Sequence, residues 1–172
     1  MIQNLMAYEE VGYKVVHKGE NFEIRYYEER IVIQTRYESG NSGFRKLFNY
    51  ISGQNQGGKK IEMTTPVTEL QDDNQMVMQF YLPARFNASS APLPADNSLE
   101  IATIDAGYFA VIQYSGFASN KNFYKHAQIL KSSLDRDNIK ISSQPIKATY
   151  NGPFTLPNLR RNEAMYLVLW DN

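Results

Sequence analysis

FRKLFNYISGQN (residues 44–55) and KIEMTTPV (residues 60–67) carry the strongest structural signal in the sequence. In the first segment, apolar side chains recur at i, i+3, i+4 and i+7, a spacing that predicts one apolar stripe along a helix. The stripe consists of Phe44, Leu47, Phe48 and Ile51. Asn41 or Ser42 can cap the start of this helix, and Gly53 suits its end, because helices often end through a left-handed residue.

The second segment predicts a strand. After a glycine-rich turn at residues 56–58, Ile61 and Met63 alternate with polar residues, which is typical of a strand with one apolar face. The helix, the turn and the strand are therefore expected to lay one apolar surface against another.

These two segments, with two others, resemble the SOUL haem-binding family. Its members carry N-Y-I-x-G-x-N shortly before K-I-x-M-T-x-P-V, and these patterns stand here at residues 49–55 and 60–67. The family's closing R-R-N-E motif matches residues 160–163, and FEIRYY at residues 22–27 matches its early motif. Because the four motifs follow the family's order over residues 13–170, the chain is identified as a member.

Length and composition bound the class of protein. The 172 residues fit one domain, residues 1–172, which can bury about 70% of the surface of its unfolded chain. Eighteen basic and eighteen acidic residues cancel, so we expect no nucleic-acid partner. The absence of cysteine excludes disulfides and thiolate chemistry. The chain starts without a secretory signal, and no stretch approaches about 18 apolar residues, so we expect a cytoplasmic protein without a membrane partner.

Period-two alternation predicts most of the other elements as strands. Residues 1–12 show no period and are expected to form a loose arm, followed by a short strand at residues 13–16. Residues 22–27 and the β-branched run 31–37 are expected to pair as a hairpin across a polar turn at residues 28–30. Further strands are expected at residues 76–82, 99–104, 108–114, 144–150 and 164–170, and a second amphipathic helix at residues 120–134.

The predicted elements repeat in the order strand, strand, helix, strand, strand. The two halves are residues 22–83 and 99–170, joined by the linker 84–98. Each half has too few strands to bury both faces of a sheet, so the halves should share one core. We expect an α+β fold in which an eight-stranded, mostly antiparallel sheet forms a distorted barrel with two helices and a pseudo-two-fold repeat. The resemblance implies the same fold, shared with the gyrase-inhibitor-like effector-binding domains.

No recognisable catalytic or metal motif is found, so we expect a protein that is not an enzyme. The two histidines, His17 and His126, are far apart and have no metal-binding spacing. No nucleophile elbow occurs, and the acidic residues are scattered in turns.

The resemblance implies a site for haem or another tetrapyrrole, held non-covalently between the first helix and the loop at residues 150–162. Each part of this site also has a structural interpretation. The helix stripe could simply pack against the sheet, and one of the loop arginines could pair with Glu163 or a neighbouring acid. The expected ligand-binding residues are Phe44, Leu47, Phe48, Ile51, Met63, Phe154, Leu156, Leu159, Arg160 and Arg161. Arg160 and Arg161 would pair with ligand carboxylates.

Ligation of a haem iron has only weak candidates. Some family members have a histidine where this chain has Tyr26. A neutral phenol, whose reference pKa is about 10, binds iron poorly. His126 lies at the border of the second helix's apolar stripe. We therefore expect weak protein ligation of the iron, or none.

Two other functions use the same surface. As a protein-interaction module, a monomer would receive a partner helix in an apolar groove. As a hydrolase or lyase acting on a lipophilic compound, the protein would need an acid in the cleft, for which Glu62 and Glu163 are the candidates.

Overall fold

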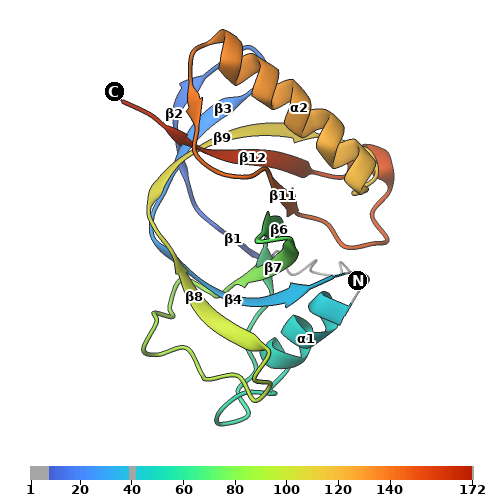
Figure 1. The fold of residues 1–172 in the computed structure, drawn as a ribbon. Coiled ribbons are helices and arrows are strands. Elements are labelled where there is room, and N and C mark those ends of the chain that lie inside the picture. Colours follow the sequence, from blue (N-terminus) through green and yellow to red (C-terminus); the bar gives the residue numbers. More distant parts are fainter. Residues whose placement is uncertain (1–7, 39–41, 172) are drawn as a thin grey trace, which may run out of the picture.

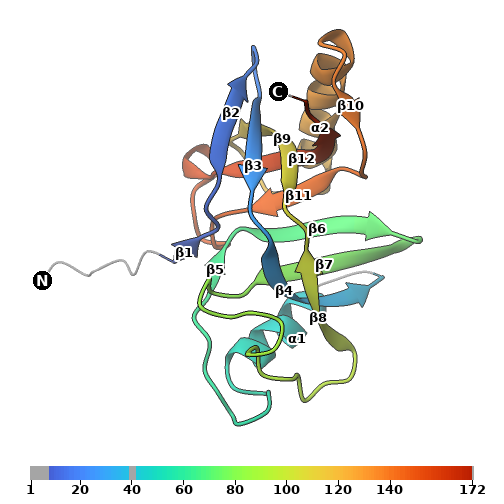
Figure 2. The same cartoon turned by 90° about the vertical axis from the view of Figure 1, so that its left-hand side faces the viewer.

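The sheet dominates the architecture, and two helices cover it (Figures 1 and 2). A computed structural model of the chain describes residues 8–38 and 42–171. The helices are α1 (Ser42–Ile51) and α2 (Asn120–Arg136), with a short 3-10 helix at Pro157–Leu159. The ten strands of the main sheet are β2 (Lys14–Lys18), β3 (Glu23–Tyr27), β4 (Arg30–Tyr37), β6 (Val67–Asp72), β7 (Gln75–Tyr81), β8 (Leu99–Ile104), β9 (Gly107–Tyr114), β10 (Lys140–Ile141), β11 (Ile146–Thr149) and β12 (Asn162–Leu169).

The halves are joined by a long antiparallel ribbon. β3 pairs with β9 and β4 pairs with β8, while β3 continues into β4 and β8 continues into β9. The predicted hairpin between residues 22–27 and 31–37 is therefore wrong. A two-residue hairpin turn needs residues that adopt positive φ, such as glycine or asparagine, and Glu28-Glu29 offers neither.

The sheet is not closed into a barrel, so that part of the expectation is wrong. Its strand order is β2-β3-β9-β12-β11-β6-β7-β4-β8, with β10 added beside β12. A barrel requires the first and last strands to pair, and β2 and β8 do not. The sheet is large, antiparallel and strongly curved, as Figure 1 shows. The predicted order of elements is found twice, as β3-β4-α1-β6-β7 and as β8-β9-α2-β11-β12.

Each helix has its own apolar cluster on one face of the sheet. Leu130 and Leu134 of α2 pack on Ala110 and Tyr166 of strands β9 and β12. Leu47 and its neighbours on α1 pack on β4, β7 and β8. A third cluster lies on the opposite face of β9 and β12 and consists of Tyr27, Phe109, Val111, Ala148 and Met165. Strands β3, β9 and β12 are therefore buried on both faces.

The segment KIEMTTPV is not the single strand that its alternation predicts. Pro66 has no N–H to donate to a ladder, so the strand is interrupted there. Only Thr64–Thr65 (β5) precedes the proline, and β6 begins after it. Ile61 is nevertheless fixed on α1, because its backbone N–H donates to the carbonyl of Ile51 at 2.8 Å. The end of α1 lies where Gly53, with φ of 121°, predicts it.

The described part of the predicted loose arm and the predicted linker both pack against other elements. Glu9–Glu10 forms β1, which pairs in parallel with β5, so the prediction of a loose arm is wrong for this part; residues 1–7 lie outside the described residues, as does Asn41. The linker 84–98 runs against α1, where the Tyr50 hydroxyl donates to the carbonyl of Pro92 at 2.7 Å. Over residues 8–38 and 42–171, no helix combines the length and apolar character needed to cross a bilayer.

Candidate functional site

The apolar stripe of α1 divides into a buried half and an exposed half. Leu47 and Ile51 are buried in the cluster beneath the helix. Phe44 and Phe48 are 41% and 49% exposed. Their rings lie nearly parallel, with centroids 6.1 Å apart, and the ring of Phe80 meets Phe44 edge-on at 5.1 Å. Core packing therefore describes Leu47 and Ile51, whereas Phe44 and Phe48 form an exposed aromatic surface.

The loop at residues 150–162 also presents apolar side chains to solvent. Phe154 is 98% exposed, and Leu156 and Leu159 are exposed as well. Figure 1 shows this loop on the same side of the molecule as α1, one on each half. Met63 is partly buried against the cluster beneath α1. The predicted apolar residues therefore include two exposed groups, the aromatic pair on α1 and the tip of the loop.

Both predicted arginines are engaged within the protein. Arg160 donates to the backbone carbonyls of Gly152 at 2.8 Å and Asn151 at 3.1 Å, which holds the loop in shape. Arg161 lies over the ring of Tyr150, with its Cζ 3.8 Å from the centroid, and also forms ion pairs. The structural alternative, a pair with Glu163, therefore describes Arg161, whereas Arg160 is held by backbone carbonyls of its own loop.

A buried ion cluster surrounds Glu163, whose side chain is 0% exposed. Its Oε1 accepts from Nη1 of Arg25 and from the hydroxyl of Tyr150, each at 2.8 Å. Its Oε2 accepts from Nη2 of Arg25 at 3.0 Å and from Nη2 of Arg161 at 3.2 Å. Arg161 also reaches Glu10 of the N-terminal segment at 2.7 Å. A fully buried carboxylate needs this number of donors to offset its lost hydration.

The same surroundings change the pKa values of the neighbouring groups. Burial, followed by the nearby Glu163 carboxylate, raises the pKa of the Tyr150 hydroxyl far above its usual range. Burial raises the pKa of Tyr27 to about 12, against the opposing effect of Arg25. Burial opposes the charge of Arg25, but Glu163 outweighs it, so the pKa of Arg25 is raised. Both tyrosines therefore remain protonated at neutral pH, Tyr150 as a donor to Glu163 and Tyr27 as an acceptor from Arg25. A structural pair of Glu163 with a loop arginine was one of the alternatives left open by the sequence. Its pairing with Arg25 was missed, although alternation in EIRYY puts Arg25 and Tyr27 on one face.

The two iron-ligand candidates lie in the half covered by α2. Tyr26 of β3 is partly buried, with its ring 5.2 Å from that of Tyr108. His126 of α2 stacks on Tyr114 at 4.0 Å, and its Nδ1 lies 2.8 Å from the carbonyl of Asn122. Within the described residues, no group of three or more histidine or acidic side chains is arranged to hold a metal ion.

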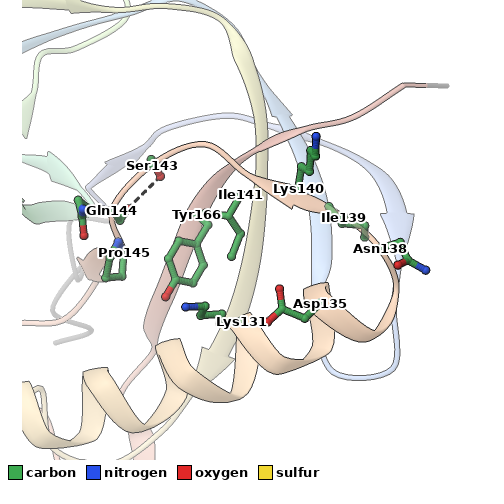
Figure 3. Close-up of a pocket in the computed structure, with 10 residues that line it drawn as sticks. All are labelled: Lys131, Asp135, Asn138, Ile139, Lys140, Ile141, Ser143, Gln144, Pro145 and Tyr166. Carbon is green, nitrogen blue, oxygen red and sulfur yellow. Dashed lines mark hydrogen bonds between the residues drawn. The ribbon is translucent and has the colours of Figure 1, made fainter.

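Two cavities lie away from the predicted residues. The larger, of about 740 Å³, is formed by the C-terminal part of α2 and the segment from Asn138 to Pro145. Figure 3 shows Tyr166 and Ile141 between Lys131 and Asp135 on one side and Pro145 on the other. The smaller, of about 520 Å³, lies beside β1 and the junction of β3 with β4. None of the ten expected ligand-binding residues lines either cavity, but Tyr26 lines the smaller one.

A family model described as "SOUL heme-binding protein" matches residues 8–167. The chain belongs to the SOUL haem-binding protein family. Among relatives of this SOUL protein, "Heme-binding protein 1" of Xenopus laevis is 28% identical, with 90% of this chain and 89% of the relative covered. "Heme-binding protein 2" of Homo sapiens is 28% identical, with 86% and 78% covered.

Solved structures share the fold of the SOUL protein at much lower identity. The EcmrR C-terminal domain superposes with a TM-score of 0.63 at 16% identity, covering 91% of this chain and 98% of that one. A structure described as a hydrolase from Listeria innocua gives 0.63 at 6% identity, covering 90% and 94%. At these identities the likeness concerns the curved-sheet fold alone.

Proposed function

We propose that this SOUL protein is a non-catalytic binding protein for haem, another tetrapyrrole or a similarly flat apolar molecule. The observation that carries the proposal is the exposed, nearly parallel pair Phe44 and Phe48 on a helix whose other apolar residues are buried. Two relatives are named heme-binding proteins, which supports the same ligand class. The bound molecule would lie on this pair and meet Phe154, Leu156 and Leu159 at its other side.

The residues present fit the apolar part of a porphyrin. A flat ring that covers the two phenylalanines removes apolar surface from water, which is worth about 25 cal/mol per Å². For the ligand carboxylates, Arg45 is the cation best suited, because it is exposed on α1 three residues before Phe48 and no ion pair joins it to a described residue. Arg160 and Arg161, by contrast, would have to give up existing bonds.

The iron of a haem would supply redox and ligand-binding chemistry, and the chain offers it no obvious axial ligand at this surface. Tyr26 and His126 belong to β3 and α2, whereas the proposed surface is built on α1. We therefore propose that the protein holds the macrocycle by its faces and its carboxylates.

The arrangement of the two acids supports a non-catalytic role. Glu163 is fully buried and accepts bonds from two arginines and a tyrosine, so it has no free position for a substrate proton. Glu62 is exposed and paired with Arg85 at 2.7 Å. Neither carboxylate has the surroundings of a catalytic acid, which needs to lie within hydrogen-bond reach of the substrate.

Titration of the purified full-length protein with haemin and with protoporphyrin tests the proposal. We expect a saturable change of the Soret band and of Trp170 fluorescence at micromolar concentrations of both ligands. Absence of a saturable change with either ligand would overturn the tetrapyrrole assignment. It would favour the interaction module, in which the same exposed aromatic and loop side chains bind a partner helix.

A further inference from the structure

The smaller cavity has the walls of a small-molecule site. Its volume of about 520 Å³ lies within the range of ligand pockets, about 300–1,000 Å³. Three segments form it: residues 9–14, residues 28–31 at the junction of β3 with β4, and residues 81–87, with Tyr26 as a further lining residue. None of these residues belongs to α1 or to the loop 150–162, so the cavity is separate from the proposed haem surface.

Arg30, one of the lining residues, has a guanidinium group without a protein acceptor. No hydrogen bond or ion pair joins it to another described residue, and its Nε and Nη2 atoms are buried. Aromatic rings hold the group in place, with its Cζ 4.5 Å from the centroid of Tyr27 and 5.1 Å from that of Phe109. Buried donors without acceptors are rare in folded proteins and commonly indicate a missing water, ion or ligand.

We propose that this cavity is a second binding site, for a small monocarboxylate with an apolar body, whose carboxylate is bound by Arg30. A carboxylate matches the fork of a guanidinium and can accept two parallel hydrogen bonds from it. The stacking on Tyr27 and Phe109 restricts the motion of the guanidinium before the ligand arrives, so less side-chain entropy is lost on binding.

The apolar body would be held by the remaining walls. Ile31 and Leu82 are buried lining residues, and Phe86 and Val11 are partly buried. These side chains give the cavity apolar walls beside the Arg30 guanidinium, and apolar walls with a few polar groups are usual in small-molecule pockets.

The acidic lining residues disfavour a ligand with more than one negative charge. Glu9 already accepts from the backbone N–H of Ala84 at 2.8 Å, and Glu10 is paired with Arg161. Glu28 and Glu29 are exposed lining residues that pair with no described cation. Lys14 offsets one of these charges. A phosphate monoester or a dicarboxylate would therefore meet more repulsion here than a monocarboxylate.

Amide proton–nitrogen correlation spectra of the labelled full-length protein, titrated with 3-phenylpropionate, test the site. We expect saturable shifts at residues 9–14, 28–31 and 81–87, detected with additions up to about 10 mM for a Kd of about 1 mM. The uncharged 3-phenylpropanamide and the dianion phenyl phosphate should each bind at least about tenfold more weakly. Absence of shifts, or shifts centred on α1 and residues 150–162, would overturn the proposal.

Variants separate the role of Arg30 from a general effect of charge. Arg30→Gln should weaken binding of the probe at least about tenfold, and Arg30→Lys should weaken it less, because the charge remains and the fork is lost. Arg36→Gln is the matched control, since Arg36 forms an exposed pair with Asp72 away from the cavity, and it should leave the affinity unchanged. Equal affinity in Arg30→Gln and in the unchanged protein would contradict the assignment, whatever the outcome of the haemin titration.

Discussion

Glu163 shows how a charged side chain can be placed in the protein interior. Strand β12 is buried on both faces, so the side chain could not reach solvent, and Arg25 and Arg161 compensate its charge instead. Replacing a whole buried ion cluster by apolar residues often changes the free energy of unfolding little. Removing only one partner lowers it strongly, because the remaining charge stays buried without compensation. Of the two functional candidates on the loop before β12, Arg161 is engaged by this cluster, and Arg160 is engaged separately by the carbonyls of Gly152 and Asn151.

The first prediction concerns Arg25. Replacing Arg25 by glutamine should lower the free energy of unfolding by about 3–5 kcal/mol, because Glu163 then keeps its burial and loses its bidentate partner. Urea unfolding followed by circular dichroism measures the change. Arg136→Gln, which removes the exposed pair with Glu20, should leave stability nearly unchanged. Similar losses in the two variants would contradict the role assigned to the buried cluster.

The raised pKa of Tyr150 predicts a loss of stability at alkaline pH. Its hydroxyl binds a proton more tightly in the folded chain than in the unfolded chain, where the pKa is about 10. The stabilisation is fully present below about pH 10 and is lost as the pH rises toward the folded-state value. Urea midpoints measured between about pH 8 and 11 should fall above about pH 10. In Tyr150→Phe, the free energy of unfolding should fall less steeply above about pH 10, by up to about 1.4 kcal/mol per pH unit. An unchanged pH dependence of the free energy of unfolding would show that Tyr150 does not titrate in this way.

At the scale of the element, α1 shows which features a sequence pattern can predict. Its bounds, its stripe and its end at Gly53 were predictable because helix period and glycine conformation are local properties. The exposure of Phe44 and Phe48 was not predictable, because the same helical spacing includes the buried Leu47 and Ile51 and the two exposed phenylalanines. The pairing of β3 with β9 was not predictable either, because it joins strands far apart in sequence. Arg25 was missed because a charged residue in an alternating strand is usually taken to face solvent.

The exposed face of α1 gives the third prediction. The double change of Phe44 and Phe48 to alanine should weaken haemin binding at least about tenfold, because the ring loses both aromatic contacts. Absorption titration at the Soret band measures the affinity. Tyr124→Ala is the control, since Tyr124 is an exposed aromatic residue on α2. If the control loses as much affinity as the double variant, the site does not lie on α1.

Haem ligation gives the fourth prediction, which concerns β3 and α2. Tyr26→Phe and His126→Ala should each change haemin affinity by less than about tenfold, or ~1.4 kcal/mol, because neither residue lies on the proposed surface. The ferric complex should show the broad Soret band of five-coordinate or water-ligated haem. A sharp six-coordinate spectrum that disappears in one variant would identify that residue as a ligand.

At the scale of the whole molecule, the ribbon of β3-β4 and β8-β9 makes the two halves parts of one sheet. The fifth prediction is that they unfold together. Trp170 packs against the cluster beneath α2, whereas far-ultraviolet circular dichroism reports both halves. The two signals should follow one urea transition. Separate midpoints would mean that each half keeps its own core.

The ribbon also restricts changes in the length of the chain. Tyr27 stands opposite Gly107 and Arg30 opposite Ile104, so the two residues at 28–29 face the two at 105–106. One inserted residue in either joint would turn every later side chain of its strand to the other face. An insertion at 28–29 would turn Ile31 and Ile33 away from the cluster beneath α1, although no core residue had been replaced. Natural variation in length should therefore concentrate in the loops, and both joints should keep two residues throughout evolution.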